Sequence, residues 1–367
     1  MTDRFDDLRA LARQLDVEAI ALVPGPNFTR AIGRAFGSHE RPFVVIIPAK
    51  GRPAAIVPNL ELTSWGNVDF DGDVFDWRDQ DGYAPAFRAF AQAMPLKSLA
   101  VEGQVMRVFV HHAIKSVLPD CAITDGEAAI SGLRMIKTDQ DITALERAIG
   151  ISERALARTL DQVRIGQSEK QIEQFLVQAL FAEGAEDQSF SPIVAAAANS
   201  AEPHAHARAD YGVKAGDPLL FDFGARWGGF AADITRTVFV GHASDEARAV
   251  YETVLAANRK GHDITRAGVT AHQIDDAVTG VLEASPFARW IRTKTGHGLG
   301  RDVHEAPYIM RGNNTELPAG TVYTNEPGLY LTGKFGVRIE DDVLVTETGC
   351  RSLTQFPTEL MVVGDKC

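Results

Sequence analysis

The first 130 positions alternate between two spacings of apolar residues. Residues 8–15 carry apolar side chains at the spacing of an amphipathic helix. Continuous apolar runs of strand length follow at residues 19–23, 43–47, 54–57 and 98–101. Because Lys50-Gly51-Arg52 is a short polar break between two of these runs, they predict a β-hairpin. We expect residues 1–130 to form a small α/β domain.

Longer helical periods begin near residue 135. Residues 141–163 carry apolar side chains at helical spacing, which predicts a long amphipathic helix. Ser168 and Gln171 match the two ends of a capping box, so a second helix is expected to begin there and to end near Gly184.

The same succession of elements recurs further along the chain. Ser244 is expected to begin a helix that ends near Gly261, and Thr270 begins another capping box. Both boxes share the frame Gly-x-Ser/Thr-x-x-Gln-Ile, which starts at Gly166 and again at Gly268, and a β-rich stretch follows each helix pair. We therefore expect residues 135–367 to be one domain of two similar halves related by an internal pseudo-twofold, with a site where the halves meet.

Two aspartates occupy the first β-rich stretch. Apolar runs on either side of Gly228-Gly229 predict a hairpin with a two-residue loop. In that register Trp227 opposes Phe230, and Asp222 lies diagonal to Asp233 on one face of the sheet. Aspartate is uncommon in strands and the apolar flanks imply burial, so this pair requires a cation.

Two glutamates occupy the second β-rich stretch. A turn about Gly333 places Glu326 directly opposite Glu340. Like charges that face each other are destabilising unless a cation lies between them. Asp341 and Asp342 compete for the ligand role, but Asp341 points to the opposite face and Asp342 lies one pair further away.

His297 supplies a nitrogen ligand. It stands between Gly296 and Gly298, which indicates that backbone or a ligand approaches closely. A single histidine is more often structural, but four expected carboxylates reverse that expectation here. Two Asp, two Glu and one His form an oxygen-rich set that favours Mn, Co, Fe or Zn at a paired site. Two cations about 3.5–4 Å apart can hold a bridging hydroxide.

Composition and charge exclude several classes of protein. The formal net charge of −12 disfavours a nucleic-acid binder, and no apolar run reaches the length of a membrane span. The amino-terminal residues lack the layout of a signal peptide. Cys121, Cys350 and Cys367 are far apart and odd in number, which predicts neither a disulfide framework nor a cysteine zinc site. We expect a cytoplasmic protein.

These motifs resemble metallopeptidase family M24, which includes Xaa-Pro dipeptidases (prolidases), Xaa-Pro aminopeptidases and methionine aminopeptidases. The matching segments are residues 200–204, 222–224, 233–237, 296–298, 303–307, 325–328 and 336–341. The resemblance implies an α+β pita-bread catalytic domain over residues 135–367. It also implies a smaller, creatinase-like α/β domain over residues 1–130, which joins a homodimer interface and walls the substrate pocket.

The resemblance also implies a cofactor. It is two divalent metal ions per chain, with manganese expected first and cobalt, zinc or iron as alternatives. The ligands that match the family are Asp222, Asp233, His297, Glu326 and Glu340. Of these, Asp233 and Glu340 match the residues that bridge the two ions.

Further roles follow by the same resemblance. Glu326 matches the general base, His304 a histidine that stabilises the tetrahedral intermediate, and His204 a histidine that orients the substrate. Thr235 and Arg338 flank the ligands and are candidates to orient the carboxylates, although Arg338 is equally compatible with an ordinary surface position.

The expected activity is hydrolysis of the peptide bond before proline by a metal-bridging hydroxide, as in an Xaa-Pro dipeptidase. Prolidases often have an arginine shortly after the His-Glu-x-Pro motif that binds the free carboxylate of a dipeptide. This chain has Tyr308 there, with Arg311 further on, which leaves an Xaa-Pro aminopeptidase acting on longer peptides open. The intact ligand set argues against a non-catalytic binding relative and against a creatinase-like amidinohydrolase.

Overall fold

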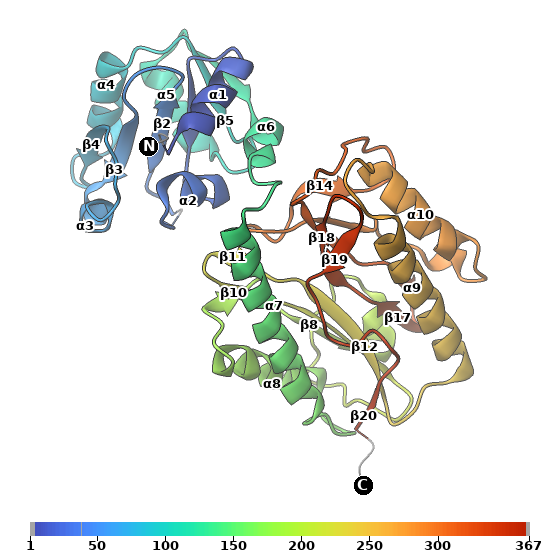
Figure 1. Ribbon diagram of the computed structural model, residues 1–367. Coiled ribbons are helices and arrows are strands. Elements are labelled where there is room, and N and C mark those ends of the chain that lie inside the picture. The colour runs from blue at the N-terminus through green and yellow to red at the C-terminus, as the bar shows by residue number, and fades with distance from the viewer. Residues whose placement is uncertain (1–3, 38, 365–367) are drawn as a thin grey trace. The chain divides into compact units, whose positions relative to one another are not determined.

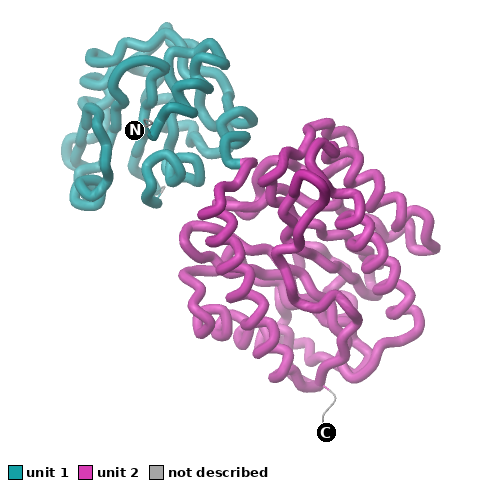
Figure 2. Tube along the Cα trace, in the orientation of Figure 1, with its two compact units in different colours: residues 1–134 teal, residues 135–367 magenta. Residues whose placement is uncertain are grey.

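The computed structural model of this chain describes residues 4–37 and 39–364. The chain divides into two compact units, Met1–Arg134 (unit 1) and Met135–Cys367 (unit 2) (Figure 2). Cys121 and Cys350 are free thiols, and Cys367 lies outside the described residues. None of the described helices combines the length and the apolar character needed to cross a membrane.

Unit 1 is built on a six-stranded mixed sheet in the order β4-β3-β2-β1-β5-β6. Its strands are β1 (Ala19–Leu22), β2 (Val44–Pro48), β3 (Ala54–Pro58), β4 (Asp73–Trp77), β5 (Ser98–Val101) and β6 (Ala122–Asp125). The four strands predicted from apolar runs are confirmed as β1, β2, β3 and β5, and β2 pairs with β3 in the expected antiparallel hairpin.

Helices cover both faces of this sheet. They are α1 (Asp6–Gln14), α2 (Pro26–Ile32), α3 (Leu62–Trp65), α4 (Ala84–Ala93), α5 (Val108–Val117) and α6 (Glu127–Gly132), with a 3₁₀ turn at Asn59–Glu61. Successive β1 side chains enter opposite cores: Ile20 packs with Leu8 and Phe28, and Ala21 with Phe87. This alternation confirms the α/β character expected of the N-terminal part.

The first half of unit 2 contains two helices and a set of antiparallel strands (Figure 1). The elements are α7 (Asp139–Leu160), α8 (Glu169–Ala182), β7 (Asp187–Gln188), β8 (Ile193–Ala196), β9 (Pro218–Phe223), β10 (Ala225–Trp227), β11 (Phe230–Ala231) and β12 (Ile234–Val240), with a 3₁₀ turn at Ala197–Ala201. Both helices pack on one apolar core with β8, β9 and β12.

The second half repeats this plan. Its elements are α9 (Asp245–Ile264), α10 (Ala271–Glu283), β13 (Gly296–Gly298), β14 (Glu305–Ile309), β15 (Val322–Asn325), β16 (Gly328–Leu331), β17 (Phe335–Arg338), β18 (Asp341–Val345) and β19 (Cys350–Ser352), with a 3₁₀ turn at Ala288–Trp290. The short β20 (Val362–Val363) returns to β12 in the first half. Helices α9 and α10 share a second core with these strands.

Hydrogen bonds around the two capping boxes show the internal repeat at atomic detail. Ser168 and Thr270 each accept from the backbone N–H three residues on, and both boxes are complete. The Gly166 N–H donates to Val213 at 2.8 Å, and the Gly268 N–H donates to Leu317 at 3.0 Å. Equivalent bonds at equivalent places support the expected pseudo-twofold.

Helices α7 and α9 have boundaries that differ from the sequence-based expectation. α7 begins at Asp139, because Thr138 caps it in a box with Asp141, and it ends at Leu160 instead of residue 163. α9 continues to Ile264, so Gly261 lies inside the helix instead of ending it. A Cβ on Gly261 would lie 2.4 Å from the Asn325 side chain, so this glycine serves close packing.

Candidate metal centre

The hairpin that carries Asp222 and Asp233 has the predicted register. Trp227 pairs with Phe230 across Gly228-Gly229, and the same register continues along β9 and β12, where Asp222 faces Thr235. Asp233 immediately precedes β12 and is 4% exposed, and Asp222 is 8% exposed. Two carboxylates therefore lie buried on one sheet face, as expected.

The second hairpin also keeps its predicted register. Gly328 pairs with Arg338 on one side of the glutamates, and Asn325 pairs with Asp341 on the other side. Glu326 and Glu340 thus occupy opposite positions between two paired segments. The Glu340 N–H donates to the Thr235 carbonyl at 3.1 Å, which joins this hairpin to the first one.

The five predicted ligands come together. Ligand atoms of Asp222, Asp233 and Glu340 lie within 4.8 Å of one another, and so do those of His297, Glu326 and Glu340. His297 Nε2 is 3.7 Å from Asp233 Oδ2 and 3.4 Å from Glu326 Oε1. Glu340 belongs to both groups and connects them.

The backbone around His297 fixes which ring nitrogen faces the carboxylates. His297 Nδ1 lies 3.2 Å from the Gly298 carbonyl, an acceptor, so Nδ1 carries the proton and the Nε2 lone pair points into the cluster. Burial lowers the pKa of His297 to about 3, which keeps the ring neutral. A Cβ on Gly296 would lie 1.7 Å from the Thr324 carbonyl, so the close approach expected from this glycine is made by backbone.

The buried carboxylates of the cluster repel one another. Burial, and then the charge of Glu340, raise the pKa of Asp233 well above its ordinary value, and burial and Glu326 do the same to Glu340. Burial also raises the pKa of Glu326 to about 7. Closely spaced buried carboxylates cannot all ionise alone, so this arrangement favours bound cations.

Arg338 and Thr235 orient two of the carboxylates. The Arg338 guanidinium donates to Asp222, to Thr235 Oγ1 at 2.9 Å and to the Tyr330 hydroxyl at 2.8 Å. Thr235 Oγ1 in turn donates to Glu340 Oε2 at 2.6 Å. Arg338 is 3% exposed, so the alternative of an ordinary surface arginine is wrong.

The predicted ligands and the two histidines predicted to act on the substrate line one cavity of about 620 Å³. The His304 ring lies 3.8 Å from the His297 ring, centroid to centroid. His204 lines the same cavity from the loop after the Ala197–Ala201 turn. The structure therefore brings the substrate-orienting candidates to the carboxylate cluster.

The cluster fits divalent metal ions. Asp222 Oδ1 is buried and has no hydrogen-bond partner among the described residues. The donor set of four carboxylates and one imidazole matches Mn, Co, Fe or Zn, and cations at this place would relieve the repulsion between the carboxylates.

Comparisons with known proteins agree with this chemistry. A model described as Metallopeptidase family M24 matches residues 143–347, and one described as Creatinase/Prolidase N-terminal domain matches residues 4–136. The chain belongs to metallopeptidase family M24. The expected fold, a pita-bread domain after a creatinase-like N-terminal domain, is thereby confirmed, and the chain is a peptidase.

Relatives of this M24 chain cover its whole length. It is 33% identical to a protein of Mycobacterium tuberculosis named Probable dipeptidase PepE, over 99% of both chains. The structure of a prolidase from Thermococcus sibiricus superposes with a TM-score of 0.93 at 34% identity, over 99% of this chain and all of that one. The structure of an X-Pro aminopeptidase from Thermotoga maritima superposes with a TM-score of 0.86 at 32% identity, again over 99% of this chain and all of that one.

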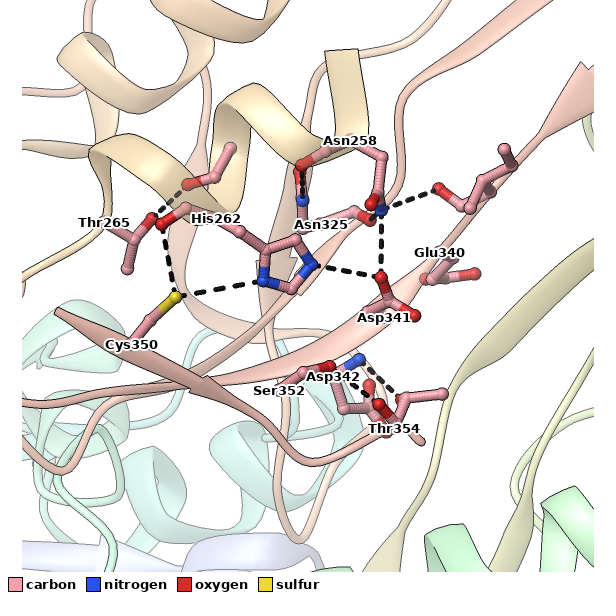
Figure 3. Close-up of polar contacts among 12 residues, drawn as sticks. Asn258, His262, Thr265, Asn325, Glu340, Asp341, Asp342, Cys350, Ser352 and Thr354 are labelled. Carbon is pink, nitrogen blue, oxygen red and sulfur yellow. Dashed lines mark hydrogen bonds and ion pairs between the residues drawn. The ribbon is translucent and has the colours of Figure 1, made fainter. Parts of the chain in front are cut away.

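In this M24 peptidase a polar network surrounds Asp341, the residue that follows Glu340. Asp341 points away from Glu340, toward His262 and Asn258 of α9 (Figure 3). Asp341 Oδ2 lies 3.0 Å from His262 Nε2 and accepts from Asn258 Nδ2 at 3.1 Å, and its other oxygen accepts from Arg236 at 2.7 Å. Arg236 also donates to the Glu340 carbonyl at 2.6 Å. Asp341 is therefore a structural anchor, and its exclusion as a ligand agrees with this geometry.

A His262→Gln variant is expected to lose stability in a pH-dependent way. Burial opposes the charged ring, but the bond to Asp341 raises the pKa of His262 to about 9. A pKa that is higher in the folded than in the unfolded chain means that the charged ring stabilises the fold. This stabilisation is fully present below the unfolded-chain pKa of about 6.5, and it is lost as pH rises through the folded-chain pKa of about 9. The variant should be less stable than wild type by at most about 3 kcal/mol at pH 6, and the gap should close by pH 10. Urea unfolding at both pH values measures it, and a gap that is independent of pH would contradict the ion pair.

Sequence reasoning missed Arg292 and Lys294, which line the cavity, and Tyr330, whose hydroxyl accepts from Arg338. Their position in the sequence could have revealed Arg292 and Lys294. They lie just before β13, and that strand carries His297 to the carboxylate cluster, so residues next to it are expected near the site.

Proposed function

We propose that this M24 peptidase is an Xaa-Pro dipeptidase that uses two divalent metal ions, with manganese the first choice. One observation carries the proposal: four buried carboxylates and the His297 Nε2 atom converge at a cavity that also contains two further histidines. The relatives named prolidase and dipeptidase support the choice of substrate.

The proposed ligands are Asp222, Asp233, His297, Glu326 and Glu340. The chemistry that a pair of divalent cations supplies at such a site is polarisation of the scissile carbonyl and a hydroxide nucleophile at neutral pH. Asp233 and Glu340 are the proposed bridging ligands. The position of Glu340 in both ligand groups supports its part of this assignment.

The remaining steps are assigned to this chain's own side chains. Glu326 is proposed to accept the proton of the attacking water, since its carboxylate faces the cavity beside His297. His304 and His204 are proposed to hold the peptide carbonyl and to stabilise the charge that develops on it. Burial lowers the pKa of His304, so its ring is neutral and has one N–H to donate.

An Xaa-Pro aminopeptidase that acts on longer peptides is the second candidate. The match to the Thermotoga maritima X-Pro aminopeptidase favours it, at an identity close to that of the prolidase. The aminopeptidase accepts further residues after the proline and the dipeptidase does not, so substrate length separates the two activities.

A matched substrate series tests the proposal. With Mn²⁺ present, Leu-Pro should release proline, and Leu-Pro-Ala should be cleaved at least about tenfold less efficiently in kcat/KM. Leu-Ala is the control for the proline requirement and should also be poor. Equal efficiency on the tripeptide would establish the aminopeptidase activity, and no cleavage before proline in either peptide would refute both.

We further propose that the protein is a cytoplasmic homodimer, with unit 1 taking part in the dimer interface. The free thiols of Cys121 and Cys350 support a reducing compartment. Sedimentation equilibrium of the full chain tests the dimer, and a monomer at micromolar concentration would contradict it.

A further inference from the structure

Three basic side chains line the cavity, those of Arg292, Lys294 and Arg338, and all but Lys294 are already engaged, as is Arg311 shortly after β14. Arg338 is buried against Asp222 and Tyr330. Arg311 points to α10, where it pairs with Asp276 at 2.9 Å and with Glu283 at 2.7 Å. Arg292 donates to the backbone carbonyls of Arg289 and Ile291 at 2.9 and 3.2 Å.

Lys294 is different. It lines the cavity and is half-buried, but the described residues include no hydrogen-bond or ion-pair partner for its ammonium group. The group lies 5.8 Å from the centre of the Tyr308 ring, which provides a cation–π contact but no negative charge. Glu326 lines the same cavity and feels the charge of Lys294, but no carboxylate among the described residues contacts the ammonium group, so the group is available to an anion.

Lys294 lies close to the histidines that are proposed to hold the peptide. It lines the same cavity as His204 and His304. In a dipeptide the terminal carboxyl carbon lies within one residue of the scissile carbonyl, and consecutive Cα atoms are about 3.8 Å apart. A carboxylate-binding group must therefore stand close to the histidines, which is where Lys294 is found.

We propose that Lys294 binds the free carboxylate of the substrate's C-terminal residue, so that the cavity selects peptides that end one residue after the scissile bond. This rests on the proposed function and makes it more specific, because such peptides are dipeptides. Arg311 does not fill this role, since two carboxylates on α10 hold its guanidinium. The Tyr308 ring faces the ammonium group and carries no negative charge that would compete with the substrate.

A different role for Lys294 is general compensation of the acidic cluster. That role predicts the same loss on every substrate, whereas carboxylate binding predicts a loss only where a carboxylate is present. Leu-Pro and Leu-prolinamide differ in that group alone, so they separate the two roles.

The test compares Lys294→Met with wild type on both substrates, in metal-loaded protein. Wild type should prefer Leu-Pro, and the variant should lose about 10- to 100-fold in kcat/KM on Leu-Pro, mainly through KM, as for a charge-assisted hydrogen bond. Leu-prolinamide turnover should change by less than about threefold, within the range of an ordinary surface substitution. Lys294→Arg should restore most of the loss. Lys334→Met removes the charge of an exposed lysine that does not line the cavity, and it should leave both substrates nearly unchanged.

An equal loss on both substrates, or no loss on either, would overturn the proposal. If wild type cleaves neither substrate, the proposed function fails, but the carboxylate site is still measurable. Calorimetric titration with the uncleaved peptides should then show tighter binding of Leu-Pro than of its amide, and Lys294→Met should abolish that difference. Equal binding of the two peptides by wild type would overturn the inference independently of catalysis.

Discussion

An Asp233→Asn variant is expected to lose at least about 10³-fold in kcat/KM for Leu-Pro, because Asn is neutral and cannot bridge two cations, whose electrostatic contribution is worth several kcal/mol. Its metal-free form should at the same time be more stable than metal-free wild type. Burial and the charge of Glu340 raise the pKa of Asp233 well above its ordinary value, which means that the empty cluster resists ionisation. Activity and metal-free stability thus move in opposite directions.

Asp342→Asn is the matched control. Asp342 lies on the same strand as Asp341 and is fully buried, and its Oδ2 atom accepts the Asp233 N–H at 3.2 Å, a bond that an amide oxygen can also accept. Burial raises the pKa of Asp342 well above its ordinary value, which favours an uncharged side chain at this position. The control should keep its metal and most of its activity. A drop as large as that of Asp233→Asn would show that the ligand assignment between these acids is wrong.

Metal removal is expected to have the second largest effect. Dialysis against a strong chelator should abolish hydrolysis of Leu-Pro, because the side chains alone leave the scissile carbonyl unpolarised, and added Mn²⁺ should restore it. The ions should also stabilise the fold, since they bind the native cluster far better than the unfolded chain. Each site adds about 2.7 kcal/mol when free metal is 100 times its dissociation constant.

Two controls accompany the chelation experiment. Thermal unfolding should show the midpoint rise with Mn²⁺ in wild type and rise much less in Asp233→Asn. Circular dichroism of the chelated protein should show that the helices persist, because the cores of α7 to α10 are apolar and independent of the cluster. Full activity in excess chelator would refute metal catalysis.

The convergence of the four acids was predictable from sequence because two tight turns fix the register. Gly228-Gly229 and Gly333 each leave little choice of pairing, and a slip of one residue would turn every acid to the other face. Asp222 and Asp233, and likewise Glu326 and Glu340, lie where the turns place them. The capping boxes at Ser168 and Thr270 fixed two helix starts by the same kind of local chemistry.

Other features depend on contacts that sequence patterns do not record. Strands β4 and β6 lie at the two edges of the unit 1 sheet and are largely exposed, so they lack the apolar runs that revealed the inner strands. Gly261 resembled a helix end but serves packing against Asn325. The sequence does not show that Arg338 is buried, and its role depends on that burial. It also does not show which nearby acids are paired elsewhere, and that pairing leaves Lys294 without an ion-pair partner among the described residues.

Anomalous diffraction from manganese-loaded crystals tests the central claim most directly. Data collected on either side of the manganese absorption edge should show two peaks per chain, both among Asp222, Asp233, His297, Glu326 and Glu340, with Glu340 in contact with each. Crystals of Asp233→Asn should lose at least one peak. A protein that cleaves Leu-Pro at full rate while its crystals show no peak among these five residues would contradict the account.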